Sequence, residues 1–198
     1  MAEQIKDGSG KGNLAKVDGN LRLSTRSVTN NESEQATKEG LSYNINTGFI
    51  TLTDDNETPI LYVINNEPTQ LHVTSVILGV GASTGGSGIN PRFRVSKNPT
   101  SGTIVSNATS VDIVSNRNFS SNTSFQGSAY KGVTGDTLSG NGDHILGFAS
   151  STSRTVLPVD EILERGDSLG VYITPETSNT STVVYCALVT HLEDPEDL

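Results

Sequence analysis

The sequence predicts an all-β protein, an antiparallel β-sandwich of jelly-roll type that follows an extended N-terminal arm. Short segments of alternating apolar and polar residues recur from about residue 41 onward, and Gly, Asn, Ser and Thr separate them. Charged residues make up only 18% of the chain, a composition that suits strands and tight turns better than helices. The stretch before Gly40 is rich in Gly, Asp and Asn and poor in apolar residues, so it cannot bury a core of its own.

These observations divide the chain into three parts. We expect an arm over residues 1–40 with a possible short helix, a sandwich body over residues 41–192, and an acidic tail over residues 193–198. The length of 198 residues fits one large β domain with an extension, because β-sandwiches often run long as single domains.

Two elements are expected in the arm. Residues 21–28 alternate enough to form one strand, which has no obvious local partner. Residues 31–40 are the only plausible helix, with Asn31 or Ser33 as N-cap, acidic residues in the first turn and Gly40 as the stop.

The body should consist of about eight to ten strands without crossover helices, which favours an antiparallel sandwich. Uneven loop lengths favour a jelly roll among sandwiches. The glycine-rich residues 79–90 resemble a flexible loop, and residues 158–167 resemble a connection with a helical turn. The expected strands are residues 41–46, 49–53, 58–66, 70–80, 92–96, 110–114, 124–130, 144–148, 155–157, 168–174 and 181–191.

Charge and hydropathy narrow the possible partners. A formal net charge of −9 argues against direct binding of nucleic acid, which depends on clustered Lys and Arg. The N-terminus lacks an apolar signal region, and no run approaches membrane-spanning length, so we expect no membrane and synthesis in a cytoplasm.

Few residues suggest chemistry. Cys186 lies in an apolar run that predicts a buried strand, and a structural thiol is expected there. His72, His144 and His191 are far apart in the sequence, and no spacing predicts that they meet, so we expect no metal and no cofactor. The acidic stretch from Asp54 to Glu57 has turn composition and does not fit a calcium loop. No nucleophile motif is present, so we do not expect an enzyme.

Several stretches are similar to structural proteins of tailed-bacteriophage virions: residues 5–18, 21–23, 43–48 and 98–104. The resemblance implies a head decoration (cement) protein on the capsid exterior, made in the host cytoplasm, with the major capsid protein as partner. It supplies no individual functional residues.

The composition of the arm adds a binding hypothesis to this resemblance. An arm that becomes ordered on a shell can add a strand to a sheet edge, and its positive charges can steer it. We also expect a homo-oligomer, a trimer or a dimer, because oligomers usually close symmetrically. The residues expected to bind the partner are Lys6, Lys11, Lys16, Leu21, Arg22, Leu23, Arg26 and Val28.

Two alternatives belong to other classes of protein. A tail or head fibre module would bind a host receptor or glycan through loops such as residues 79–90 or 132–143, although the chain has no Trp to stack on a sugar. A small hydrolase would turn over generic ester or glycoside substrates, and we expect no such activity.

Overall fold

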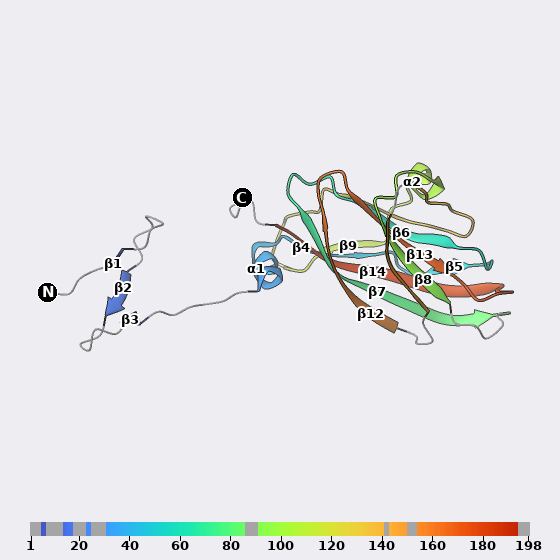
Figure 1. Cartoon of the computed structure of the whole chain (residues 1–198), viewed down its shortest axis with the longest axis horizontal. Helices are drawn as coiled ribbons and strands as arrows, with labels where there is room; N and C mark the ends of the chain where they lie inside the picture. The colour runs from blue at the N-terminus through green and yellow to red at the C-terminus, as the bar shows by residue number, and fades with distance from the viewer. Residues whose placement is uncertain are drawn as a thin grey trace. The chain divides into compact units, whose positions relative to one another are not determined.

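The computed structural model describes residues 31–85, 91–140, 143–149 and 154–193, and the backbone of three short N-terminal strands. The chain forms two compact units, Met1–Asn31 and Glu32–Leu198 (Figure 1). Within the described residues, no helix is long and apolar enough to cross a bilayer.

The N-terminal unit contains a small antiparallel sheet. Its strands β1 (Ile5–Lys6), β2 (Leu14–Val17) and β3 (Leu23–Ser24) lie in the order β1-β2-β3. Of the strand expected over residues 21–28, the structure describes only Leu23–Ser24 in β3, and the other residues lie outside the described part of the chain. Strand β3 has a local partner, since Leu23 pairs with Val17 in β2.

Helix α1 (Glu32–Glu39) is the first element of the second unit. It matches the helix expected from the sequence, and Gly40 ends it with a φ of 78°, a conformation that glycine adopts without strain. The division between the units falls between Asn31 and Glu32, so this helix belongs with the sandwich and not with the arm.

The sandwich consists of two sheets (Figure 1). The five-stranded sheet has the order β10 (Ser128–Lys131), β6 (Thr58–Ile64), β13 (Ser168–Thr174), β8 (Arg92–Lys97) and β11 (Asp143–Ala149). The six-stranded sheet has the order β12 (Arg154–Leu163), β7 (Leu71–Thr84), β14 (Ser181–Leu192), β4 (Ser42–Asn46) and β9 (Ile113–Asn116), and β5 (Ile50–Leu52) also pairs with β14.

The strand pairing is nested, which defines a jelly roll. Strand β4 pairs with β14, β6 with β13, β7 with β12, and β8 with β11, all antiparallel. This is the pattern of one long antiparallel ribbon rolled up so that successive strand pairs alternate between the two sheets. The prediction of an all-β sandwich of jelly-roll type is confirmed.

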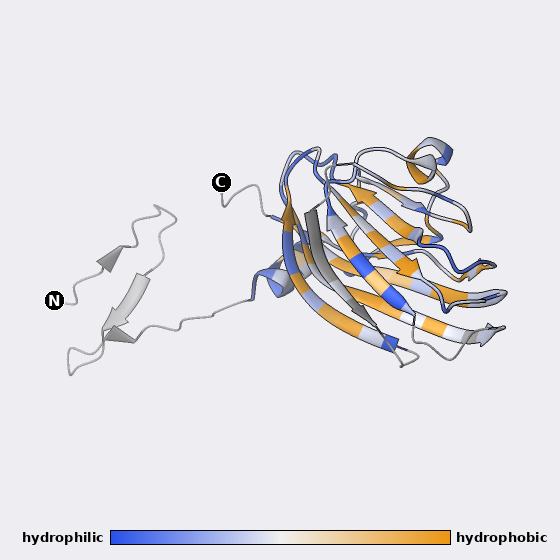
Figure 2. Ribbon diagram, turned by 45° about the vertical axis from the view of Figure 1, so that its right-hand side comes forward, coloured by the Kyte–Doolittle hydropathy of each residue, from blue (hydrophilic) through white to orange (hydrophobic). Residues whose placement is uncertain are grey.

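Alternation along the strands places the main core between the sheets. In β14, Val184, Cys186 and Leu188 are fully buried, and the residues between them are half-buried. Burial of such side chains stabilises the fold by roughly 1.5–3 kcal/mol each. Figure 2 shows hydrophobic residues concentrated along the strands and hydrophilic ones in α1.

A second, smaller core lies on the outer face of the five-stranded sheet. Tyr62 and Tyr172 belong to it, and their neighbours along β6 and β13 belong to the main core, so the two tyrosines point away from the sandwich interior. Helix α2 (Thr103–Asn107) covers them through the fully buried Ile104. This helix was not expected from the sequence.

Thr47 joins β4 and β5, which lie end to end along β14. Its backbone N–H donates to the Cys186 carbonyl (2.9 Å), and its Oγ1 accepts a hydrogen bond from the Cys186 N–H (2.9 Å). The hydroxyl also donates to the Gly48 carbonyl (2.8 Å). The buried hydroxyl of Thr47 thus accepts the hydrogen bond of a β14 backbone N–H at the break between β4 and β5, where a strand carbonyl would otherwise accept it.

Several sequence predictions were wrong in the body: the strands expected over residues 110–114 and 124–130 are β9 (Ile113–Asn116) and β10 (Ser128–Lys131). Residues 158–163 belong to strand β12 and form no helical turn. Pro158 is tolerated there because β12 is an edge strand, and the register shifts between Pro158 and Glu161 beside Asp160, whose φ is 49°. Residues 79–84 of the expected loop continue strand β7 in pairing with β14, and residues 86–90 of that loop lie outside the described residues.

Candidate functional site

The residues expected to bind a partner all lie in the N-terminal unit. Lys6, Lys16 and Leu23 belong to strands β1, β2 and β3, which the structure describes by their backbone alone. The remaining five lie outside the described residues: Lys11, Leu21, Arg22, Arg26 and Val28.

Two histidines that are far apart in the sequence meet on the outer face of the six-stranded sheet. His72 in β7 and His191 in β14 are cross-strand partners. Leu71 and Leu192, their chain neighbours, belong to the main core, so period-2 alternation turns both imidazoles to the opposite face. The rings stack with their centroids 4.8 Å apart and their planes 22° apart.

Helix α1 covers this pair of rings. His72 and His191 line a cavity of about 30 Å³ together with Glu32, Gln35, Ala36 and Glu39 of the helix. A hydrogen bond from the Leu41 N–H to the Ala36 carbonyl (2.7 Å) and one from the Leu192 N–H to the Leu41 carbonyl (2.8 Å) tie the end of the helix to β14. The cavity is therefore built by three elements: α1, β7 and β14.

Several polar atoms in the cavity have no hydrogen-bond partner among the described residues. His191 is only 5% exposed, and neither of its ring nitrogens is paired within this part of the chain. The Nε2 of His72 and the Oε2 of Glu193 are also buried and unpaired. A buried polar group without a hydrogen-bond partner destabilises the folded state, so we expect a ligand or a water molecule to bind these atoms.

Glu32 completes a set of possible metal ligands. One ligand atom each from Glu32, His72 and His191 lies within 4.8 Å of the other two. Burial lowers the pKa of His191, and the neighbouring His72 lowers it further, whereas Glu32 raises it. His191 is thus held as the neutral imidazole near pH 7, which is the form that binds metals.

The spacing of these two histidines in the sequence predicts no metal site, and their meeting in the fold was not expected. Each one adjoins a core leucine, a pattern that could have assigned both to an outer sheet face. Their pairing depends on the register of β7 against β14, which no local pattern reports. His144 lies in β11 of the other sheet, so it is not a partner of this pair.

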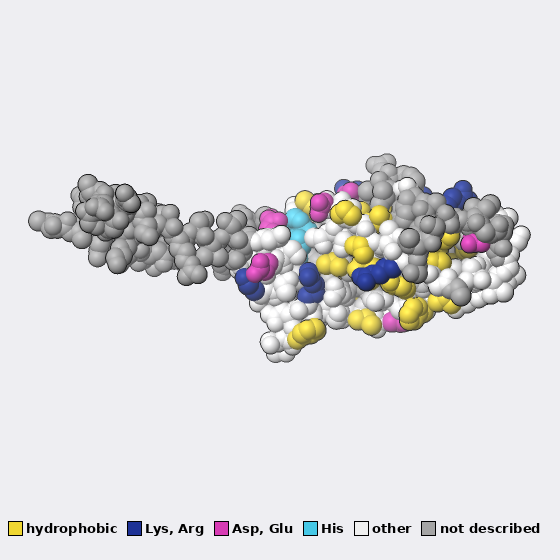
Figure 3. All heavy atoms as spheres, turned by 90° about the horizontal axis from the view of Figure 1, so that it is seen from below, with side chains coloured by type: hydrophobic (Ala, Val, Ile, Leu, Met, Phe, Trp, Pro, Cys, Tyr) yellow, Lys and Arg dark blue, Asp and Glu magenta, His cyan; other side chains and the backbone are white. Residues whose placement is uncertain are grey.

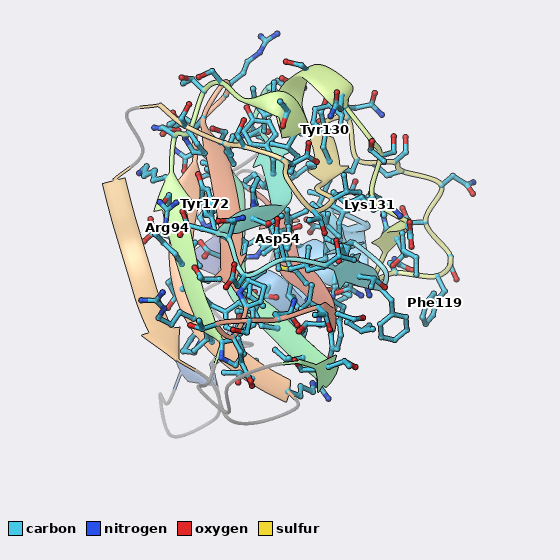
Figure 4. All side chains as sticks on the ribbon, turned by 90° about the vertical axis from the view of Figure 1, so that its right-hand side faces the viewer. Asp54, Arg94, Phe119, Tyr130, Lys131 and Tyr172 are labelled. Atoms are coloured by element: carbon cyan, nitrogen blue, oxygen red, sulfur yellow. The ribbon has the colours of Figure 1, made fainter. Side chains whose placement is uncertain are left out.

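A second cluster of charged and aromatic groups lies on the five-stranded sheet. The Arg94 guanidinium donates to both carboxylate oxygens of Glu57 (2.9 and 2.6 Å) and to Ser96 Oγ (2.9 Å). It also lies 3.7 Å from the ring centroid of Tyr172 on the neighbouring strand (Figure 4). These contacts fix Arg94 as a structural residue that stabilises the outer face of this sheet.

The oxygen-rich stretch from Asp54 to Glu57 forms a turn, as the sequence indicated. The Asp54 carboxylate accepts from the Asn56 N–H (3.2 Å), and the Asp55 carboxylate accepts from the Ser178 N–H (3.0 Å). Glu57 is paired with Arg94. These carboxylates have different partners, and they do not form a group of possible metal ligands among the described residues.

Cys186 is fully buried in the centre of β14, as predicted. Burial raises the pKa of its thiol well above the ordinary value. The neutral thiol therefore packs as a small apolar group and does not act as a nucleophile.

Part of the surface of the body is apolar. Phe49 is 78% exposed and touches Tyr185 edge to face, with ring centroids 5.9 Å apart. Val156 on β12, at the edge of the same sheet, is 53% exposed. Figure 3 shows hydrophobic side chains gathered on one face of the body.

Phe119 lies in a separate place. It is 99% exposed and lines an open hollow of about 470 Å³ together with Lys38, Arg117 and Asn118. Figure 4 shows its ring projecting from the β9–β10 connection into solvent.

The described fold defines the class of protein: an antiparallel jelly-roll sandwich with a separate N-terminal unit. No family model matches the chain, and no curated protein matches it.

Proposed function

We propose that the protein is a non-enzymatic structural component of a virus particle. It is a decoration (cement) protein that binds the shell of a major capsid protein from outside and stabilises it. The observation that carries the proposal is the separation of residues 1–31 from the sandwich as a unit of their own.

The size of the N-terminal sheet supports a role in binding. Its three strands have two, four and two residues. So little backbone pairing is marginally stable in isolation, and such a sheet gains stability when another surface covers it. A protein that binds the assembled shell but not free subunits shifts the equilibrium toward the shell.

The composition of the same unit indicates how it would bind. Lys6, Lys11, Lys16, Arg22 and Arg26 add positive charge to a chain of net charge −9, which favours an acidic surface as the target. Leu21, Leu23 and Val28 supply apolar contacts for strand addition to a capsid sheet edge.

The apolar surface of the body supports self-association. A soluble monomer gains nothing from an exposed Phe49 beside Tyr185, whereas a symmetric contact between copies would bury both rings. We propose a dimer or a trimer whose interface includes Phe49 and Tyr185. Sedimentation equilibrium of Phe49→Ser should show a weaker oligomer, and an unchanged mass would exclude this face.

The experiment that tests the function mixes the full chain with shells that lack it. We expect stoichiometric co-sedimentation and a higher temperature of shell disruption. A variant that lacks residues 1–30 should remain folded, because both sandwich sheets lie in Glu32–Leu198, yet it should not sediment with the shells.

A charge-reversal variant of full length complements this deletion. Lys11→Glu with Arg26→Glu keeps the length of the chain and should weaken binding most at low salt, where electrostatic steering is strongest. Retained binding of the deleted chain would refute the assignment of the N-terminal unit. Failure of the full chain to bind any shell would refute the cement role.

A fibre module that binds a host receptor or glycan is the second candidate. The hollow beside Phe119 favours it, because an exposed aromatic ring next to amide and basic side chains can hold a sugar. Reproducible glycan-array binding that Phe119→Ala abolishes would select this function over the first.

A further inference from the structure

We propose that Glu32, His72 and His191 form a binding site for one divalent transition-metal ion, with Zn²⁺ as the best fit. The site lies on the outer face of the six-stranded sheet, under helix α1. It is independent of the shell-binding role of the N-terminal unit.

The first step is geometric. The candidate ligand atoms of the three residues all lie within 4.8 Å of one another. Ligand atoms around tetrahedral zinc, at bond lengths of 2.0–2.1 Å, are separated by roughly 3.4 Å. The Glu32 side chain is exposed, so rotation about its χ angles can bring its carboxylate closer to the rings. Rotation of the two imidazoles about their own χ angles would bring their nitrogens together without movement of the strands.

The second step concerns burial. His191 is 5% exposed with both nitrogens unpaired, and His72 Nε2 is buried and unpaired beside it. No described residue that packs here explains two stacked imidazoles with unpaired nitrogens. A metal ion satisfies a nitrogen of each ring at once, and the cavity of about 30 Å³ is large enough for an ion and too small for an organic ligand.

The third step identifies the class of ion. Two imidazoles with one carboxylate suit Zn²⁺, Co²⁺ or Ni²⁺, whereas Ca²⁺ and Mg²⁺ prefer sites made of oxygen ligands alone. Glu193 lines the same cavity, and its buried Oε2 has no partner among the described residues. Its carboxylate could therefore complete the coordination or orient a ligand.

The ligands come from three elements, which gives the ion a structural role. Glu32 is the first residue of α1, while His72 and His191 lie in β7 and β14. A bound ion would cross-link the helix to the sheet at the residue where the second unit begins. It would stabilise the folded chain, because the unfolded chain does not hold the three ligands together.

The test is a titration of the chelator-treated full chain with Zn²⁺ by calorimetry and thermal unfolding. We expect one ion per chain and a rise in Tm of about 5–10 °C at a free Zn²⁺ concentration about a hundred times Kd. Co²⁺ should bind at the same site and show the intense d–d absorption of a tetrahedral complex.

Two variants assign the ligands, and two others are matched controls. Glu32→Gln and His72→Gln should each weaken Zn²⁺ binding at least about tenfold, because even the loss of an outer-shell partner costs 10- to 100-fold. Glu34→Gln in the same helix and His144→Gln in the other sheet should leave the affinity unchanged. Circular dichroism of the metal-free chains checks that all four variants fold.

Three results would overturn the proposal. The first is that Zn²⁺, Co²⁺ and Ni²⁺ produce neither heat of binding nor a change in Tm. The second is binding that Glu32→Gln and His72→Gln leave unchanged, and the third is binding weakened by His72→Gln alone, which would remove Glu32 from the site. Because every measurement uses the protein without a shell, these results do not depend on capsid binding.

Discussion

Thr47 offers a direct test of how the break between β4 and β5 is stabilised. Its side chain is fully buried, and its Oγ1 is the acceptor for the Cys186 N–H at 2.9 Å. Thr47→Val keeps the shape of the side chain and removes the hydroxyl. The variant therefore leaves one buried N–H in the middle of β14 without a partner, and it also removes the hydrogen bond to the Gly48 carbonyl.

The magnitude follows from these two losses. An unsatisfied buried donor costs about 1–3 kcal/mol, and a lost neutral hydrogen bond costs about 0.5–1.5 kcal/mol, so Thr47→Val should destabilise the protein by about 2–4 kcal/mol. Thr47→Ser keeps the hydroxyl and loses one methyl group, which costs about 1 kcal/mol. Thr47→Ser should thus be more stable than Thr47→Val.

Urea unfolding of the full chain, followed by circular dichroism, measures both variants. The unfolding midpoint should fall more in Thr47→Val than in Thr47→Ser, with an unchanged m-value. In thermal scans the valine variant should lose about 4–16 °C in Tm. If the valine variant were as stable as the wild type, or more stable than the serine variant, the hydroxyl would not support the strand break and the reasoning would be wrong.

Three further predictions concern the core and the outer face of the sheets. Leu188→Ala, in the fully buried centre of β14, should cost about 2–5 kcal/mol in urea unfolding; a cost under 1 kcal/mol would mean that this core is loosely packed. Cys186 should react with a thiol reagent only at the rate of unfolding, because its thiol is buried and its pKa is raised; rapid modification of the native chain would contradict this burial. Arg94→Lys should destabilise the protein by only about 1 kcal/mol, since it loses the bidentate contact with a partly exposed Glu57 and the stacking on Tyr172. A double-mutant cycle of Arg94→Met and Glu57→Gln measures the coupling energy between Arg94 and Glu57.

Local patterns in the sequence predicted most of the elements of the body. The segment at residues 168–174 coincides with β13, because its apolar residues are bounded by polar turns on both sides. Helix α1 carries acidic residues in its first turn and ends at Gly40, signals that are read directly from the chain. Pro158 was misleading because the sequence does not state which strand lies at an edge.

The candidate metal site could not be predicted in the same way. His72 and His191 lie 119 positions apart in the chain (191 minus 72), and only the long-range pairing of β7 with β14 brings them together. The register between β7 and β14 even shifts between Val189 and Thr190, close to the site. Only the completed sheet brings the two rings under α1 and next to Glu32.

The nested strand pairing has a consequence for how the protein is made. Strand β14 lies between β7 and β4 in the middle of its sheet, yet it is the last strand of the sandwich to leave the ribosome. Until then, the edges of β4 and β7 that it will occupy are unpaired and open to association with other chains. The body therefore folds only after synthesis of β14, and a nascent chain that stops short of Ser181 should need a chaperone to stay soluble.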